Sequence, residues 1–307
     1  MHRINGFNKS EFNKPLSLVL GFFDGVHLGH IELIKRALKH TKKRDTISCV
    51  LTFDEHPENV ISSGIVTPSI TSNEVKAEIF DALGLDMMLM LKFREVKDIS
   101  PSDFMYKLCE LNPLYIVCGY DYRFGKGAVA DTGELKKLCD SRGIKCEIIP
   151  PVTFDGKTVS SSHIRELIRL GDVCEANRLM FRPYCVYTEV EYGRSLGRNL
   201  GIPTINQYID EDCITPYYGV YLSRTYIGNN MYSSVTNIGI KPTVGGKNPM
   251  AETHIFDYTG DLYGEKVRVD ILKLIRDEKR FESVEALKLQ MKSDIDIAKS
   301  LQSKFGF

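Results

Sequence analysis

The chain has 307 residues, of which 43 % are hydrophobic and 26 % charged, the composition of a globular protein with room for about two domains. Lys plus Arg and Asp plus Glu number 40 each, so neither a basic excess for nucleic acid nor an acidic excess typical of disorder is present. No apolar run approaches the ~20 residues of a membrane span, and the first residues lack the apolar core of a signal peptide.

The eight cysteines include no Cys-x-x-Cys pair, the spacing that zinc sites often use. Most of them lie inside apolar segments, where thiols in a reducing compartment behave as small buried hydrophobic groups. We therefore expect a cytoplasmic protein that binds neither nucleic acid nor a membrane. We expect it to be a monomer or a weak homo-oligomer.

Short apolar runs alternate with helical patterns over residues 1 to about 180. Strands are predicted at 16–21, 46–53, 87–92, 114–118 and 145–149, and helices at 29–43, 72–83, 101–111, 131–142 and 160–180. This alternation predicts a parallel sheet flanked by helices. Ligands of such sheets bind beyond the carboxyl ends of the strands.

The stretch from Val19 to His30 joins the first predicted strand to the first predicted helix and contains His27-Leu28-Gly29-His30. Chance alone gives this pattern in roughly one chain in a hundred of this composition. Backbone N–H groups and two imidazoles at a helix N-terminus can face one anion, and glycine lets a phosphate approach the backbone. The stretch predicts a nucleotide triphosphate site; the alternative is two solvent-facing histidines in a loop.

Three further segments of this half carry candidate chemistry. Phe53 follows the second strand, and Asp121, Tyr122 and Phe124 follow the fourth. These aromatic rings can sandwich a planar ligand that Asp121 orients, although they can equally be core residues. Ser160-Ser161-Ser162-His163-Ile164-Arg165 opens a helix, where serines act as caps and, with the arginine, can also bind a phosphate.

The sequence changes character after Arg182-Pro183-Tyr184. Short β-rich runs separated by Gly, Pro and Asn continue to about 280, which predicts a small antiparallel barrel or sandwich. A last helix follows, with apolar residues at helical spacing from Val284 to Ala298. The sequence therefore predicts two domains, 1–182 and 183–307.

The segment from Gly193 to Asn206 is the second informative stretch. Its glycines and arginines describe a cationic flap without the Gly-Lys-Ser/Thr end of a Walker P-loop. Thr204 and Asn206 alternate on a strand, so they share one face, and their oxygens are hard ligands suited to Mg²⁺. A glycine hairpin with a Thr/Asn turn is the alternative.

The N-terminal motifs resemble the nucleotidylyltransferase superfamily and, in the form Gly-Phe-Phe-Asp-Gly-Val-His-Leu-Gly-His, its FAD synthetase branch. The resemblance implies a Rossmann-like α/β domain with catalytic His27, His30 and Arg165. It implies that the ATP phosphates are bound by Gly21, Phe23, Asp24, Gly25, Gly29, Ser161 and Ser162. It implies that the flavin is bound by Phe53, Asp121, Tyr122 and Phe124.

The C-terminal half resembles riboflavin kinases through Gly-Arg-Ser-Leu-Gly before Ile-Pro-Thr-Ile-Asn and through Ala251-Glu252-Thr253-His254. The resemblance implies a β-barrel kinase domain with Glu252 as the catalytic base and Thr204 and Asn206 holding Mg²⁺. It further implies ATP contacts at Gly197, Arg198, Gly201 and Pro203, and a flavin contact at Arg276.

The two resemblances together imply a bifunctional enzyme that phosphorylates riboflavin to FMN with ATP and adenylylates FMN to FAD with a second ATP. Departures from the family pattern at Thr188, Ala128 and Ala130 leave open a single-activity enzyme with one degenerate domain. A flavin sensor without turnover is the other alternative; the complete set of candidate catalytic residues speaks against it, because binding alone does not require a base.

Overall fold

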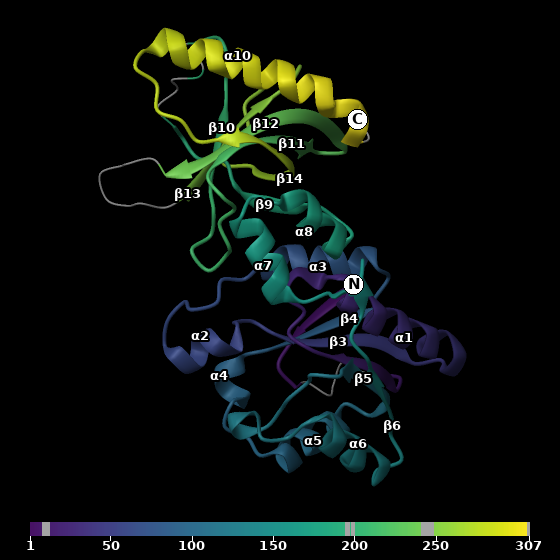
Figure 1. Ribbon diagram of the computed structural model, residues 1–307. Coiled ribbons are helices and arrows are strands. Elements are labelled where there is room, and N and C mark those ends of the chain that lie inside the picture. Colours follow the sequence, from purple (N-terminus) through teal and green to yellow (C-terminus); the bar gives the residue numbers. More distant parts are fainter. Residues whose placement is uncertain (8–12, 194–196, 198–199, 241–248, 306–307) are drawn as a thin grey trace. The chain divides into compact units, whose positions relative to one another are not determined.

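The computed structural model describes residues 1–7, 13–193, 197, 200–240 and 249–305 (Figure 1). By packing, the chain divides into two compact units, unit 1 (Met1–Ser161) and unit 2 (Ser162–Phe307). This division falls earlier in the chain than the domain boundary predicted after residue 182, which stays a prediction. Within the described ranges, no helix is both long and apolar enough to cross a membrane.

Unit 1 is built on six parallel strands in the order β1-β4-β3-β2-β5-β6. The strands are β1 (His2–Asn5), β2 (Leu16–Leu20), β3 (Ile47–Phe53), β4 (Met87–Leu91), β5 (Pro113–Gly119) and β6 (Lys145–Ile149). The chain builds outward from β2 in one direction through β3 and β4, and in the other through β5 and β6. The strand order thus reverses between β2 and β5, and the crevice at such a reversal is where doubly wound sheets bind ligands.

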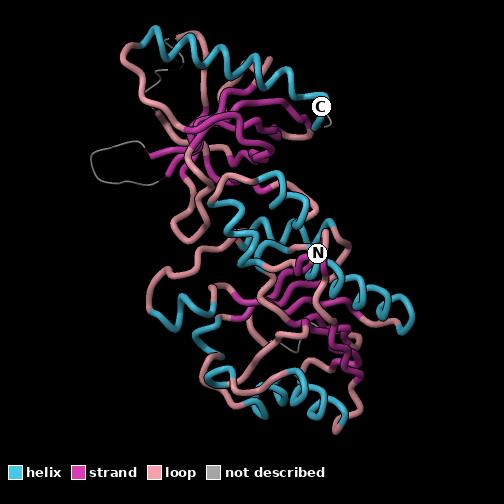
Figure 2. The backbone as a smooth tube through the Cα atoms, in the orientation of Figure 1, coloured by secondary structure: helices cyan, strands magenta, loops and turns pink. Residues whose placement is uncertain are grey.

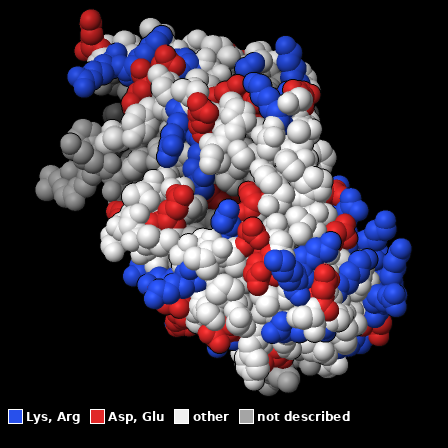
Figure 3. All heavy atoms as spheres, turned by 60° about the horizontal axis from the view of Figure 1, so that its bottom comes forward, with Lys and Arg blue, Asp and Glu red and all other residues white. Residues whose placement is uncertain are grey.

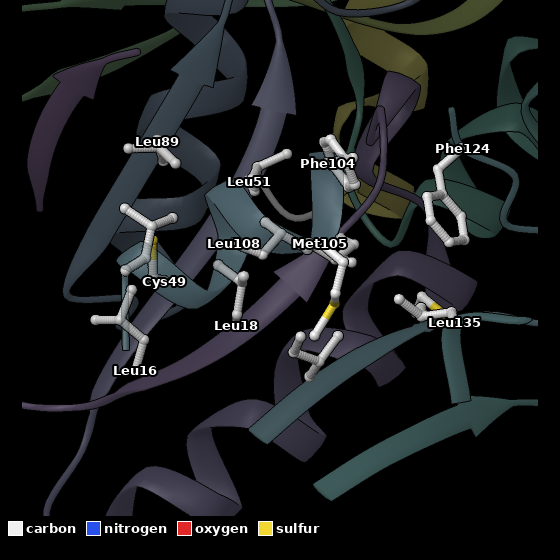
Figure 4. Close-up of a cluster of buried hydrophobic side chains, with 14 of the residues drawn as sticks. Leu16, Leu18, Cys49, Leu51, Leu89, Phe104, Met105, Leu108, Phe124 and Leu135 are labelled. Atoms are coloured by element: carbon white, nitrogen blue, oxygen red, sulfur yellow. The ribbon is translucent and has the colours of Figure 1, made fainter. Parts of the chain in front are cut away.

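Helices cover both faces of this sheet, as Figures 1 and 2 show. The helices of unit 1 are α1 (Leu28–Arg44), α2 (Pro57–Ser62), α3 (Asn73–Ala82), α4 (Phe93–Val96), α5 (Pro101–Glu110) and α6 (Thr132–Asp140). Leu16 and Leu18 of β2 pack toward α5 and α6, in the cluster drawn in Figure 4, whereas Val19 packs toward α1 and α3. Because both faces of the central strands β2, β3, β4 and β5 are buried, these strands are mostly apolar, which is typical of parallel sheets.

One polar group of this unit lies near the amino ends of the strands. His40 of α1 stacks on Tyr115 of β5 with 4.4 Å between ring centroids, and its Nδ1 lies 2.8 Å from Ser17 Oγ. Burial, reinforced by the neighbouring charges of Lys145 and Arg44, lowers the pKa of the His40 imidazole; Glu147 acts in the opposite direction. The folded unit therefore favours neutral His40.

Unit 2 carries a six-stranded antiparallel sheet in the order β10-β13-β12-β11-β14-β9. The elements are α7 (Ser161–Arg169), α8 (Val173–Met180), β9 (Tyr184–Glu189), β10 (Ile205–Tyr208), β11 (Gly219–Ile227), β12 (Asn230–Ile240), β13 (Pro249–Ile255), β14 (Lys266–Asp277) and α10 (Val284–Leu301). The edge strands approach one another, because Gln207 Nε2 donates to Thr188 O at 2.8 Å and Thr188 Oγ1 donates to Tyr208 O at 2.9 Å. The sheet is therefore nearly closed into a barrel, which is one of the two forms that the sequence pattern predicts and the one that the family resemblance implies.

A chain of hydroxyl groups fills part of the barrel interior. Four hydrogen bonds of 2.7–2.9 Å link side chains of three neighbouring strands. The linked residues, in order, are Thr225, Ser234, Ser223, Thr236 and Thr253. All five are completely buried, and each hydroxyl has a partner, as buried polar groups require. On the outer face, Leu222 and Leu272 pack with Ala298 of α10.

One predicted helix was wrong, and the short elements β1, α2 and α4 were not predicted. The helix predicted at 160–180 is two helices, because Gly171 adopts φ +82° and ends α7, with Asp172 capping α8 by accepting from Glu175 N. A Cβ at Gly171 would also lie 3.0 Å from Leu274 Cδ2. The sequence further missed β1, whose four residues pair with distant β4.

Acidic and basic side chains are interspersed over the face drawn in Figure 3, in keeping with the balanced charge.

Candidate active sites

The turn after β2 is the first candidate site, and the chain secures it from several sides. Phe23 adopts φ +58° and Gly25 φ +75°, so the backbone turns sharply before α1. Asp24 is buried and its Oδ1 accepts hydrogen bonds from Ile70 N at 2.8 Å and Thr71 N at 3.2 Å. The Asp24 carboxylate thus joins the turn to the segment before α3 by two hydrogen bonds.

His27 and His30 form a stacked pair at the start of α1. Their ring centroids lie 3.7 Å apart with planes 16° from parallel, and the ring of His30 also meets Phe23 edge to face at 5.2 Å. A Cβ on Gly29 would lie 3.0 Å from His27 Cε1. Gly29 therefore leaves room for the close approach of the imidazole, and its predicted role in the approach of a phosphate stays a prediction.

The buried ammonium group of Lys76 forms a hydrogen bond to the same turn. Lys76 of α3 is 1 % exposed, and its Nζ donates to Phe22 O at 3.2 Å while lying 4.4 Å from the centre of the Phe22 ring. Thr52 Oγ1 donates to the same carbonyl at 2.8 Å. With two donors, this carbonyl orientation is strongly fixed.

The predicted flavin contacts in unit 1 divide between the core and the surface. Phe53 and Phe124 are buried in the core cluster, and Phe124 packs against Phe104 with centroids 5.7 Å apart. Tyr122 stacks on Phe124, and burial raises the pKa of its hydroxyl. Asp121 is exposed. A flavin contact at these residues stays a prediction.

The serine-rich start of α7 was predicted to bind phosphate. Ser161 Oγ donates to Asp24 O at 2.9 Å, which adds another tie to the turn after β2. Ser162 is exposed, whereas Arg165 is 6 % exposed. Phosphate binding by these residues stays a prediction.

Unit 2 contains a cavity of about 260 Å³ between the barrel and α10. Its polar side includes Thr204, Asn237 and Glu252, and its apolar side includes Leu287 and Met291. Cross-strand register sets one polar row, because Glu252 of β13 pairs with Asn206 of β10 on one side and with Asn237 of β12 on the other. Such neighbours lie close enough to act on one ligand.

The donor set at Asn206 and Thr204 fits a hard cation. Asn206 is 5 % exposed, and its buried Oδ1 has no hydrogen-bond partner among the described residues. A Cβ on Gly193 would overlap the Asn206 amide, and one on Gly197 would overlap Ile202 O and lie 3.3 Å from Thr204 Oγ1. An amide oxygen that lacks a donor among the described residues, near a threonine hydroxyl, is the kind of oxygen ligand that Mg²⁺ takes.

Arg276 lines the same cavity, but most of its donors are engaged by protein. Its Nε and Nη2 each donate to the Asp294 carboxylate at 2.8 Å, and its Nη1 donates to Asp277 O at 2.8 Å. Gln290 Nε2 donates to Asp294 at 2.9 Å. Arg276 therefore joins β14 to α10; its predicted flavin contact remains untested.

Among the cavity residues that were not singled out from the sequence are Asn237 and His254. Their positions relative to Glu252 could have indicated them. Asn237 pairs with Glu252 across the strands, and His254 follows Glu252 by two residues and so lies on the same strand face. Of the predicted ATP contacts, Gly201 adopts φ +75°, Pro203 O contacts His254, and Arg198 lies outside the described residues.

Comparisons with known proteins agree for both units. The FAD synthetase family matches residues 9–163, and the riboflavin kinase family matches residues 180–302. The chain is similar to the bifunctional riboflavin kinase/FMN adenylyltransferase of Bacillus subtilis, with 33 % identity covering 90 % of this chain and 89 % of the relative. The same enzyme of Listeria monocytogenes is 33 % identical, covering 95 % and 94 %.

A solved structure is similar over nearly the whole length. It is titled a macrolide-efflux protein from Streptococcus pneumoniae and has a TM-score of 0.85 at 29 % identity, covering 97 % of this chain and 99 % of that one. The description as an efflux protein applies to the Streptococcus protein and not to this chain. On the two family matches and the full-length relatives, this chain belongs to the bifunctional riboflavin kinase/FMN adenylyltransferase family.

Proposed function

We propose that unit 2 phosphorylates riboflavin to FMN with ATP and that the turn after β2 in unit 1 serves the transfer of AMP from a second ATP to FMN, which gives FAD and pyrophosphate. The observation that carries the proposal is the row Asn206–Glu252–Asn237, of which Glu252 and Asn237 line a cavity that also has an apolar wall. A carboxylate, an oxygen-rich cation site and an apolar surface are the parts that phosphorylation of a flavin alcohol needs.

In the kinase step, Glu252 accepts the proton of the ribityl 5′-hydroxyl while the oxygen of that hydroxyl attacks the γ-phosphorus of ATP. The new O–P bond forms as the bond to the β-phosphate oxygen breaks, and ADP leaves. Asn237, beside Glu252 in the register, can hydrogen-bond the ribityl chain. Leu287 and Met291 of α10 offer the apolar surface for the isoalloxazine ring.

Thr204 Oγ1 and Asn206 Oδ1 are the groups that would hold Mg²⁺ together with ATP phosphate oxygens. When bound, the ion neutralises the negative charge that otherwise repels an attacking oxygen. The glycines at 193 and 197 allow the Asn206 amide and the Ile202 carbonyl to approach closely, which helps to keep the two ligands in place.

In the adenylylation step, a phosphate oxygen of FMN attacks the α-phosphorus of ATP, and pyrophosphate leaves. The nucleophile is already an anion, so this step requires no general base. We assign His27 and His30 to the charge of the phosphates, since they lie together at a helix N-terminus, where anions are favoured. Arg165 is proposed for the same role from the family resemblance alone.

We propose a cytoplasmic location and a monomer or weak homo-oligomer. All eight cysteines are buried or half-buried, as small hydrophobic thiols in a reducing compartment are. The balanced charge offers no electrostatic attraction for nucleic acid or anionic membranes.

A chromatographic time course with riboflavin, ATP and Mg²⁺ tests the proposal. FMN should appear first and FAD later. FMN that accumulates without FAD would contradict the role of unit 1, and conversion of added FMN without conversion of riboflavin would contradict that of unit 2.

Two variants assign the sites. Glu252→Gln should lower FMN formation about 10²–10⁴-fold, as loss of a general base does, and should leave adenylylation of added FMN unchanged. His30→Ala should lower adenylylation about 10²–10³-fold, the usual loss for one group that stabilises a transition-state charge, with FMN formation unchanged. Equal loss of both activities in either variant would contradict two separate sites.

A further inference from the structure

The side chain of His254 meets the backbone of the segment that enters β10. His254 Nδ1 lies 2.7 Å from the carbonyl oxygen of Pro203. Pro203 comes directly before Thr204, and the paired strand β10 begins one residue later at Ile205. Because a proline lacks the N–H group, the Pro203 backbone can be held only through its carbonyl.

This contact lies where the regular pairing of β10 with β13 ends. The last strand pair at this end is Ile205 with Thr253, so continuation of the ladder would place Thr204 opposite His254. The ladder stops there, and the imidazole of His254 reaches the carbonyl one residue further on. A side-chain hydrogen bond thus replaces the backbone bond that would otherwise fix this segment.

The partner identifies which ring nitrogen carries the proton. A carbonyl oxygen only accepts hydrogen bonds, so Nδ1 of His254 donates and Nε2 is the lone-pair nitrogen of the neutral ring. Burial lowers the pKa of His254, with Lys299 acting in the same direction and the Pro203 carbonyl and Asp257 opposing it. The ring is therefore neutral at neutral pH and keeps this tautomer.

We propose that His254 is a positioning residue for the kinase reaction, which donates Nδ1–H to Pro203 O and so holds Thr204 and Asn206 in the geometry that binds MgATP. The inference rests on the proposed metal-binding role of Thr204 and Asn206. His254 and Glu252 share a face of β13 and line one cavity, so the strand that presents the base also aligns the phosphate site.

Two amide substitutions separate the ring nitrogens. In His254→Asn the amide nitrogen can take the place of Nδ1, whereas in His254→Gln it takes the place of Nε2. We expect His254→Asn to retain the wild-type KM for MgATP. His254→Gln should raise this KM about tenfold, as the loss of one hydrogen bond does, with the KM for riboflavin unchanged.

Binding provides a readout that does not depend on turnover. Calorimetric titration with ADP in the presence of Mg²⁺ and in the presence of EDTA measures the gain in affinity that the ion supplies. His254→Gln should lose most of this gain and His254→Asn should keep it. Adenylylation of added FMN on the same chain is the control for folding of unit 1.

Three results would overturn the inference. Wild-type binding by His254→Gln would remove the role of the hydrogen bond, and equal defects in both amide variants would remove the assignment to Nδ1. Loss of riboflavin binding by His254→Gln, measured by quenching of flavin fluorescence, would mean that His254 only maintains the barrel. Thr204→Ala tests the underlying proposal separately, since unchanged Mg²⁺-dependent ADP binding in that variant would refute the metal site while leaving the His254 contact intact.

Discussion

Substitution of Arg276 tests how α10 is held against the barrel. In Arg276→Ala, the Asp294 carboxylate loses two charge-assisted hydrogen bonds of 2.8 Å and retains the bond from Gln290. The Asp294 side chain is 4 % exposed, so most of this carboxylate lies away from bulk water. The variant leaves a buried charge without its counter-ion.

The expected cost is about 3–5 kcal/mol of the free energy of unfolding of unit 2, the range for breaking one partner of a buried pair. Coulomb's law gives a similar figure, about 4 kcal/mol for unit charges ~4 Å apart at an effective dielectric constant of ~20. Replacing both partners in Arg276→Met with Asp294→Leu should cost much less, since no buried charge then remains.

Urea unfolding followed by circular dichroism, with kinase turnover and adenylylation of added FMN measured in parallel, separates the two units. Arg276→Ala should shift the transition of unit 2 and lower kinase turnover while adenylylation persists. Stability within about 1 kcal/mol of the wild type, together with a raised KM for riboflavin alone, would refute this reasoning and favour Arg276 as a direct flavin contact.

Further predictions concern Gly29, Gly197 and His40. Gly29→Ala should not lower helix stability but should slow adenylylation, since its Cβ would lie 3.0 Å from the His27 ring; Gly64→Ala, with open space around it, is the control, and equal rates in both would contradict the argument. Gly197→Ala should abolish FMN formation and spare adenylylation, which an assay of both products checks. Burial lowers the pKa of His40 below 6.5, so the unfolded chain binds the proton more tightly than the folded chain. The contribution of neutral His40 to stability is therefore present above pH 6.5 and is lost as the pH falls below it. The urea midpoints of the wild type and of His40→Gln should converge at acid pH.

The sequence predicted the parallel sheet and the antiparallel barrel or sandwich because their signals are local. Leu16 and Leu18 on one face of β2 and Val19 on the other are apolar and buried, as in a parallel strand covered on both sides. The four residues of β1 carry no such signal, since their place depends on pairing with β4, more than 80 residues away in the chain.

Site geometry was less accessible from the sequence, because the same residue types serve ligands and cores. Phe53 and Phe124 fit a flavin sandwich in the sequence but are buried with core residues in the structure. The contact between His254 and Pro203 O joins residues 51 apart in the chain. No periodicity predicts such a contact, since it depends on where a strand ladder ends.

The hydroxyl chain inside the barrel has a consequence for the outer face. Thr236 and Thr253 share a hydrogen bond of 2.9 Å only in the register that also sets Glu252 opposite Asn237. A slip of β13 by two residues would keep apolar and polar faces correct but would leave buried hydroxyls without partners, at a cost of about 1–3 kcal/mol each. The interior hydroxyls thus favour one strand register, and in that register Glu252, the proposed base, lies beside Asn237.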